Sequence, residues 1–159
     1  MIEGYLAFAR GEGEENTEPV EVDRLLEEVA ENARRNGARV ELEAHTGMTM
    51  TLRPNAFRRC LGNLLGNAAR HAEHIRLAAQ RGDRYLEITI DDDGPGIPED
   101  RREDVFKAFF RLDSARNLDS GGVGLGLSIS RDIIHAHGGK ISLETSSLGG
   151  LRVGMLLPV

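Results

Sequence analysis

The chain lacks the features that would place it in a membrane, in an oxidising compartment or on a nucleic acid. No apolar run approaches the ~18 residues needed to cross a bilayer, and the N-terminus lacks the charged-then-apolar order of a signal peptide. A single cysteine, Cys60, excludes an internal disulfide and lies in an apolar helical stretch, so we expect a buried thiol in a reducing compartment. A net charge of -6 argues against a general nucleic-acid surface. Any anion must therefore be bound locally, by backbone amides and a few placed cations.

The composition that remains suits one compact domain. The chain has 159 residues with 40% hydrophobic content, enough for a small core and too little for two full domains. Residues 1–9 are typical of a short helix, and 10–19 form a polar, acidic linker that contains glycine. We therefore divide the chain into a helical remnant with its linker, 1–19, and a domain over 20–159.

Hydrophobic spacing predicts three long helices and about six strands in the domain. A 3.6-residue period marks the helices, and alternation of apolar with polar residues marks the strands. Helices are expected over 22–33, from Pro54 through Ala68 and over 124–137, with a short one over 99–106. Strands are expected over 40–44, 48–52, 75–79, 86–90, 141–143 and 153–157. The first two of these strands are expected to form a hairpin.

These elements favour an α/β (α+β) two-layer sandwich. The expected architecture is one mixed sheet, with its strands largely in hairpins and the three main helices on one face. The other face is expected to be partly solvated. Two long loops, 94–98 and 112–121, fall between elements that would lie side by side.

A polar patch interrupts the second helix. Asn63, Asn67, Arg70 and His71 share one face of that helix by their spacing. Asn is a mediocre helix former, so two of them one turn apart need a reason. A neutral oxygen suits Mg²⁺, and Arg70 is placed to meet a phosphate. A solvated helix face with two tolerated Asn residues stays open as the alternative.

Two glycine-rich loops could approach a ligand. Asp92 ends an apolar strand and precedes Gly94 and Gly96, so its carboxylate could accept a hydrogen bond from an exocyclic amine such as that of adenine. An ordinary Asp/Gly/Pro loop remains the alternative. The run 121–127 leads into the third helix, where free N–H groups and the helix dipole favour an anion.

Other nucleotide-binding signatures are missing from the second loop. It lacks the Lys-Ser/Thr ending of a P-loop, its glycine spacing differs from the dinucleotide fingerprint, and signatures of Ser/Thr/Tyr kinases are absent. Three of the five Phe lie within 106–110, which is typical of a core and also of the anchor of a nucleotide lid.

The polar helix face, the two glycine-rich loops and the Phe-rich segment between them, taken in their order along the chain, resemble one family. That family is the catalytic ATP-binding domain of bacterial sensor histidine kinases (GHKL ATPases). NLLGNA (63–68) is similar to the family's N box, DDGPGIP (92–98) to the G1 box, VFKAFFR (105–111) to the F box and GGVGLGLSI (121–129) to the G2 box. The tail HAHGGKISLETSSLGG (135–150) is similar to the family's last helix and strands, and FFRLDSAR (109–116) to the osmosensor-type kinases. The resemblance covers about residues 20–159. It implies a Bergerat-type fold that clamps ATP between the N-box helix and a lid.

Residue roles follow from the resemblance, position by position. Asn67 resembles the Mg²⁺ ligand, Asn63 a supporting polar group near the metal and Arg70 a basic residue that meets the phosphates; these three are the implied catalytic residues. Asp92 resembles the carboxylate that reads the adenine amino group. The further implied nucleotide contacts are His71 beside the adenine, Gly94, Gly96 and Ile97 on its floor, Lys107 and Arg111 near phosphate or partner, and Gly122, Val123, Gly124, Leu125, Gly126 and Leu127 around the phosphates.

Two positions depart from the family pattern. His71 lies where many members have Tyr or Phe stacked on adenine, and a His stacks more weakly. Val123 lies where Thr or Ser is common, which removes a hydroxyl donor to phosphate.

The phosphoacceptor histidine of the family is missing from this chain. None of its five His lies in an H-E-x-x-x-P-like context, and residues 1–9 resemble the end of the dimerisation hairpin. The resemblance implies a cytoplasmic fragment of an inner-membrane sensor, inactive alone. Its implied partners are the dimerisation and histidine-phosphotransfer domain and a response regulator, with no nucleic acid and no membrane contact by the fragment.

The implied activity is presentation of the γ-phosphate of Mg-ATP to a histidine on that separate domain. The attacking imidazole already has a lone pair, so no strong general base is needed, in keeping with Asn63 where water-activating relatives have a carboxylate. Two alternatives stay open: a non-catalytic interaction module of the same fold, and a related serine kinase that regulates sigma factors.

Overall fold

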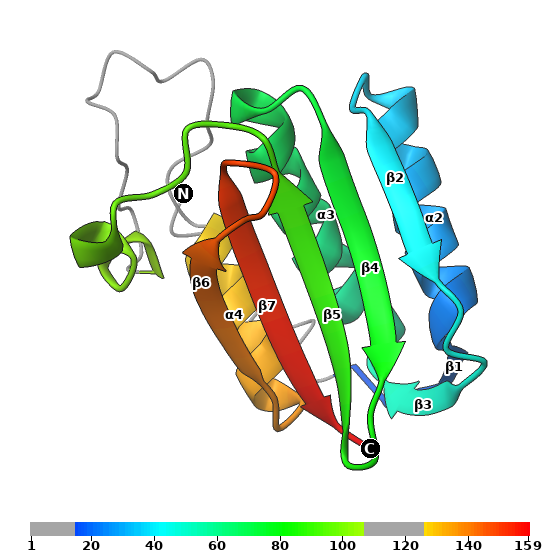
Figure 1. Cartoon of the computed structure of the whole chain (residues 1–159). Coiled ribbons are helices and arrows are strands. Elements are labelled where there is room, and N and C mark those ends of the chain that lie inside the picture. The colour runs from blue at the N-terminus through cyan, green and yellow to red at the C-terminus, as the bar shows by residue number, and fades with distance from the viewer. Residues whose placement is uncertain (1–14, 107–125) are drawn as a thin grey trace.

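The structure, a computed structural model, describes residues 15–106 and 126–159. The helix expected over 1–9 and most of the second glycine-rich loop lie outside these ranges. The described residues form a five-stranded sheet with three helices on one face, and a separate two-stranded sheet at one end (Figure 1). This arrangement confirms the two-layer α/β sandwich.

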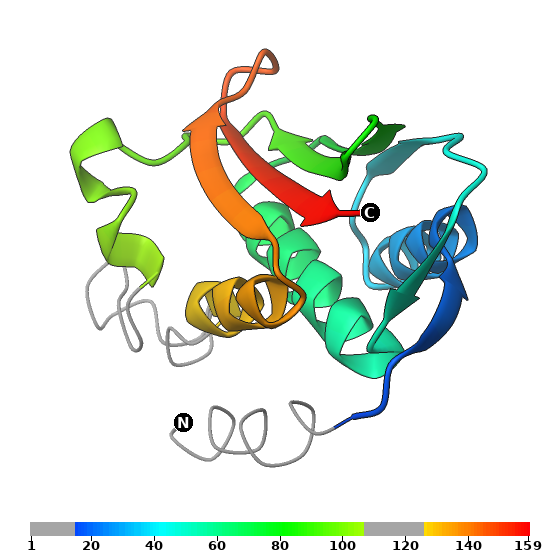
Figure 2. The same ribbon diagram turned by 90° about the horizontal axis from the view of Figure 1, so that it is seen from below.

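The three helices are α2 (Val22–Arg35), α3 (Pro54–His71) and α4 (Gly126–Ala136). Each buries one apolar face, as the 3.6-residue spacing predicts. Pro54 is the first residue of α3, where its missing N–H costs little. Figure 2, turned by 90°, shows that all three helices lie on the same side of the five-stranded sheet. None of the helices in the described ranges is both long and apolar enough to span a bilayer.

The five-stranded sheet is mixed. Strands β2 and β4 are parallel, and every other neighbouring pair is antiparallel. In spatial order the strands are β2 (Val40–Ala44), β4 (Ile75–Arg81), β5 (Tyr85–Asp92), β7 (Leu151–Pro158) and β6 (Lys140–Thr145). The neighbours β4–β5 and β6–β7 form hairpins, in keeping with the expectation that the strands lie largely in hairpins.

The hydrophobic core lies between the sheet and the helices. Alternate residues of β5, including Ile88 and Ile90, face it and are fully buried. Cys60 of α3 is also in the core, with no exposed surface, and burial raises the pKa of its thiol to about 12. The expected buried thiol is thus confirmed.

The opposite face of the sheet is polar and carries a row of alternating charge. Directly paired positions of the five strands hold, in order, Glu41, Arg76, Asp91, Arg152 and Glu144. Arg76 Nε lies 3.7 Å from a carboxylate oxygen of Glu41. We call this set the charge row; it allows one face of the sheet to remain uncovered by helices.

The hairpin expected between the first two strands is wrong. Strand β3 (Thr49–Leu52) pairs antiparallel with β1 (Glu18–Glu21), whose first two residues lie in the segment expected to be linker. Strand β2 instead pairs with β4. The intervening loop is held by Asp23 of α2, which accepts hydrogen bonds from Thr46 N at 3.0 Å and Gly47 N at 2.9 Å. Apolar alternation locates a strand but does not select its partner.

The short helix expected over 99–106 is two single 3₁₀ turns, Glu99–Arg101 and Asp104–Phe106. Phe106 is buried and lies 4.8 Å below the guanidinium of Arg131 of α4. For this Phe the core interpretation holds. Phe109 and Phe110 lie outside the described residues.

Candidate nucleotide-binding site

The candidate site lies where the end of β5 and the loop that follows it meet the last turns of α3. The loop 93–98 leaves the sheet beside those turns (Figure 1). Helix α3 also packs against α4, whose first residue is Gly126. Residues predicted from two separate boxes are thus brought to one end of the sandwich.

The polar face of α3 is present as expected. Asn63 and Asn67 are half-buried, whereas Leu64 and Leu65 between them face the core. Asn67 Oδ1 accepts a hydrogen bond of 2.8 Å from Arg70 Nη1. That oxygen has two lone pairs, so one remains for a second partner. Arg70 and His71 are exposed, and Arg70 orients the Asn67 amide.

Asp92 is the buried carboxylate of the site, with 7% of its surface exposed. Its Oδ1 accepts hydrogen bonds from Gly94 N at 3.0 Å and from Leu151 N at 3.1 Å. Among the described residues, every hydrogen bond to the carboxylate of Asp92 ends on Oδ1 and none ends on Oδ2. Oδ2 is therefore the oxygen that can accept a hydrogen bond from a ligand.

Glycines let the backbone approach closely around Asp92. A Cβ on Gly94 would lie 2.6 Å from the carbonyl oxygen of His71, so the loop and the end of α3 touch through main-chain atoms. Gly96 has a φ of 74°, a left-handed conformation that favours glycine. Ile97 is partly buried and packs on the core. The backbone of the loop therefore lies directly against the end of α3 and against Gly150.

Asp93, which the sequence did not single out, fixes the segment that leaves α3. Its Oδ1 accepts hydrogen bonds from Glu73 N at 2.8 Å and His74 N at 3.0 Å, and its Oδ2 lies 2.9 Å from His74 Nδ1. The hydrogen bond from the backbone N–H of His74, and after it the hydrogen bond from the His74 ring, lower the pKa of Asp93 to about 2. Asp93 therefore joins the start of the loop to the segment that follows α3.

The turn between β6 and β7, residues 146–150, was also missed. Gly150 N donates to the carbonyl oxygen of Asp92 at 3.0 Å. A Cβ on Gly150 would collide with Asp92 Oδ1. In the sequence, the pair Gly149-Gly150 between two expected strands indicates only a turn. No sequence signal placed that turn against the carboxylate, because the hydrogen bond from Leu151 N, next to the turn, to Asp92 Oδ1 joins residues 59 apart.

Besides Arg70, only Gly126 and Leu127 among the residues predicted to contact the phosphates lie within the described ranges. Gly126 begins α4, and Leu127 is partly buried against the core. The amides of a first helical turn are donors without a helical partner, which suits an anion. The other predicted contacts lie outside the described residues: Lys107, Arg111, Gly122, Val123, Gly124 and Leu125.

The sequence matches one family model, "Histidine kinase-, DNA gyrase B-, and HSP90-like ATPase", over residues 52–159. This region holds the whole of the candidate site and most of the five-stranded sheet.

Similar proteins include sensor histidine kinases and their ATP-binding domains. The sensor histidine kinase GtrS of Pseudomonas aeruginosa is 44% identical over 91% of this chain, and CpxA of Escherichia coli K12 is 33% identical over all of it. The chain spans only 29% and 36% of those two proteins. The crystal structure of the ATP-binding domain of PrrB from Mycobacterium tuberculosis is 32% identical, covers 91% of this chain and is itself 98% covered, with a TM-score of 0.76.

Full-length ShkA, in a crystal structure in complex with AMPPNP, matches 99% of this chain with a TM-score of 0.81 and 28% identity; the match covers 35% of ShkA. The family match, these relatives and the shared fold agree with one another. The chain belongs to the histidine kinase-, DNA gyrase B- and HSP90-like ATPases, as the catalytic ATP-binding domain of a sensor histidine kinase.

Proposed function

We propose that this domain binds Mg-ATP and presents its γ-phosphate to a histidine on a separate dimerisation and phosphotransfer domain. The observation that carries the proposal is the buried Asp92 carboxylate. One of its oxygens is held by two backbone amides, and the other is left for a ligand beside the polar face of α3.

The residues present fit a nucleotide. Asp92 Oδ2 is a hydrogen-bond acceptor for the adenine amino group, and Gly94, Gly96 and Ile97 form the floor below the ring. His71 ends α3 next to Gly94 and is exposed, so its ring is available to stack on the base. These features support adenine at the end of β5.

Asn67 is the proposed protein ligand of Mg²⁺. Mg²⁺ keeps several waters and takes one or two protein oxygens together with substrate phosphates. Asn63, one turn earlier on the same face, would hydrogen-bond within this shell, and Arg70 would neutralise phosphate charge. Bound Mg²⁺ would supply further charge neutralisation.

Helix α3 carries no Asp or Glu over its whole length. Phosphoryl transfer depends mainly on positioning and charge neutralisation, and an imidazole nucleophile needs no base to free its lone pair. A helix with amides and an arginine, but without a carboxylate, suits donation to histidine better than activation of water.

The wider context belongs to the same proposal. The relatives are named sensor histidine kinases, and the chain spans about a third of their length. This supports a parent protein in which the acceptor domain precedes the domain described, a response regulator receives the phosphate and the sensor lies in the inner membrane.

Isothermal titration with a non-hydrolysable ATP analogue tests the proposal. We expect binding that requires Mg²⁺, a large loss of affinity in Asn67→Ala and no change in Asn55→Ala, which alters an exposed Asn on the same helix. Adding a dimerisation domain that bears the acceptor histidine should then yield phosphohistidine from ATP.

Two results would contradict this function. Absence of any nucleotide binding would favour a non-catalytic interaction module, and phosphoserine on a partner would favour a serine kinase. Equal affinity with and without Mg²⁺ in both wild type and Asn67→Ala would remove Asn67 as the metal ligand.

A further inference from the structure

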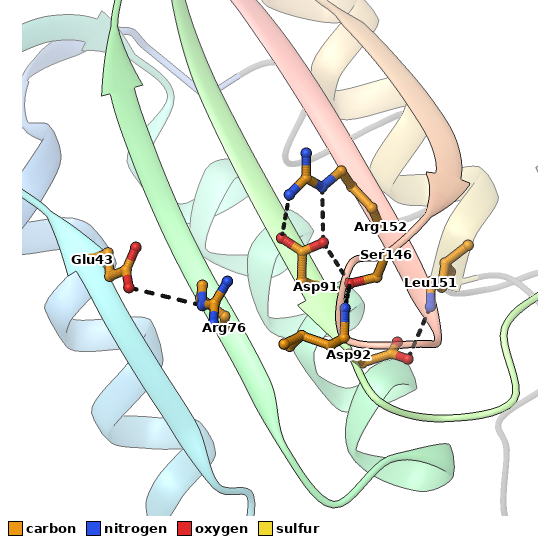
Figure 3. Close-up of polar contacts among 8 residues, drawn as sticks. Glu43, Arg76, Asp91, Asp92, Ser146, Leu151 and Arg152 are labelled. Atoms are coloured by element: carbon orange, nitrogen blue, oxygen red, sulfur yellow. Dashed lines mark hydrogen bonds and ion pairs between the residues drawn. The ribbon is translucent and has the colours of Figure 1, made fainter.

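Two consecutive aspartates at the end of β5 hold the turn 146–150 from opposite faces of the sheet (Figure 3). Asp92 holds the end of the turn, through Gly150 N and Leu151 N. Asp91 holds its start, because Ser146 Oγ donates a hydrogen bond of 2.8 Å to Asp91 Oδ1. The turn cannot move at either end without disturbing one of these two residues.

Asp91 is a fixed anchor, with only 1% of its surface exposed. Arg152, its direct partner on β7, donates from Nε to Oδ1 at 2.8 Å and from Nη2 to Oδ2 at 3.2 Å. The hydrogen bond to Asp91 is the main cause that raises the pKa of Arg152. A buried carboxylate that is paired and bidentate keeps one position, because leaving it would strand a charge.

Ser146 relays that position into the turn. Its hydroxyl donates to Asp91 and also accepts a hydrogen bond of 3.0 Å from Leu148 N. Ser146 is 4% exposed, so water does not readily replace either bond. Loss of the hydroxyl would free the turn from Asp91 and leave Leu148 N without this acceptor.

The turn 146–150 also contacts the Asp92 carboxylate directly. Gly150 has no space for a Cβ beside Asp92 Oδ1, so its backbone is in direct contact with the side chain of Asp92. Leu151 N, the next amide along, is one of the two donors that hold Oδ1. The direction in which Asp92 Oδ2 points thus depends on where the turn lies.

We propose that Asp91 and Ser146 are positioning residues for recognition of the nucleotide base. They fix the turn 146–150, which fixes Asp92 Oδ1 and aims Oδ2 at the exocyclic amine of the base. Neither residue touches the ligand. This inference rests on the proposed function, since it assigns the base to Asp92.

The test is base discrimination, measured as the ratio of dissociation constants for purine riboside triphosphate, which lacks the amino group, and ATP. In Ser146→Ala we expect this ratio to fall by about two- to tenfold, the value of one well-placed hydrogen bond, with binding of the purine nucleotide unchanged. Ser146→Thr keeps the hydroxyl and should keep the ratio. Ser142→Ala, the same change at an exposed position of β6, should also keep it.

A purely structural role has a different signature. If Ser146→Ala lowers the melting temperature but leaves the ratio at the wild-type value, or weakens both nucleotides equally, the inference is overturned. Asp91→Asn gives a second variant if Ser146→Ala does not fold; it keeps an acceptor for Ser146 but loses the charge, and should lower the ratio less. Failure of the proposed function looks different again: wild type would then show no preference for ATP, or Asp92→Asn would retain it.

Discussion

At the scale of single residues, Asp93 shows how a carboxylate outside the proposed ligand contacts stabilises the site. Hydrogen bonds from His74, and then Glu73, favour its charged form in the folded protein and lower its pKa from 3.8 to about 2. The unfolded chain therefore binds a proton at a higher pH than the folded chain does. The stabilisation is present above the unfolded pKa and is lost as the pH falls towards the folded pKa.

We expect Asp93→Asn to lower the free energy of unfolding at neutral pH. The difference from wild type should shrink as the pH falls from about 4 to about 2, because protonation removes the same interaction from wild type. Urea unfolding at a series of pH values measures this. Asp83→Asn, at an exposed Asp before β5, provides the control and should show no such trend. A difference that stays constant down to pH 2 would contradict the assignment.

The sequence identifies the proposed ligand contacts better than the residues that support them. Asp92, Asn63 and Asn67 stand in local motifs, so a short segment suffices to identify them. Asp91 and Ser146 are 55 residues apart, and nothing near either one signals the other. Their contact depends on the pairing of β5 with β7, which is a property of the folded sheet.

At the scale of secondary structure, helix α3 obtains its N-terminal cap from a distant segment. Arg53 at the N-cap position makes no side-chain capping bond, and the first turn has no acidic residue. Glu15 takes both roles: its carboxylate oxygens accept hydrogen bonds of 3.0 Å from Asn55 N and from Ala56 N. A carboxylate at this end also interacts favourably with the helix dipole.

Glu15→Ala should therefore destabilise the domain by roughly 0.5–2 kcal/mol, the usual cost of losing an N-cap. Hydrogen exchange at the amides of Asn55 and Ala56 should become faster, because these groups lose their acceptor. Urea unfolding and amide exchange by NMR measure the two effects. Glu18→Ala, at an exposed position on β1, is the matched control. Unchanged exchange at both amides would show that the cap is not formed in solution.

Periodicity and Pro54 suffice to predict α3, whereas its cap could not be predicted. Glu15 lies in a segment whose acidic composition indicates only a linker. The same local information failed for the expected hairpin, because β2 and β3 are close in sequence yet lie in different sheets. Propensity and spacing are local properties, and strand pairing is not.

At the scale of the whole molecule, the sheet order depends on the parallel pairing of β2 with β4. Parallel neighbours need a long crossover, and here β3 and α3 provide it. The two layers follow from the alternation of apolar residues, but the crossover requires knowledge of which strands meet. In the described part of the chain it leaves β2 and β6 as the two edges of the five-stranded sheet.

Charges on an edge strand discourage pairing with another sheet. We expect Glu41→Lys on β2 to increase self-association at low salt, because a cation at this edge would then face Glu144 on the β6 edge of a second copy. Sedimentation velocity over a range of protein and salt concentrations measures the effect. Glu27→Lys makes the same charge change at an exposed position of α2 and should leave the degree of self-association at the wild-type value. Equal association by both variants would indicate an effect of net charge alone.

The charge row on the open face of the sheet has an odd number of members, one on each of the five strands. Its signs alternate over five strands, and an alternating series with an odd number of members begins and ends with the same sign. Whichever edges of two copies met in register, glutamate would therefore oppose glutamate, and like charges directly opposite one another destabilise strand pairing. The ion pairs that join the strands of one sheet thus leave both of its edges with the charge that repels another copy.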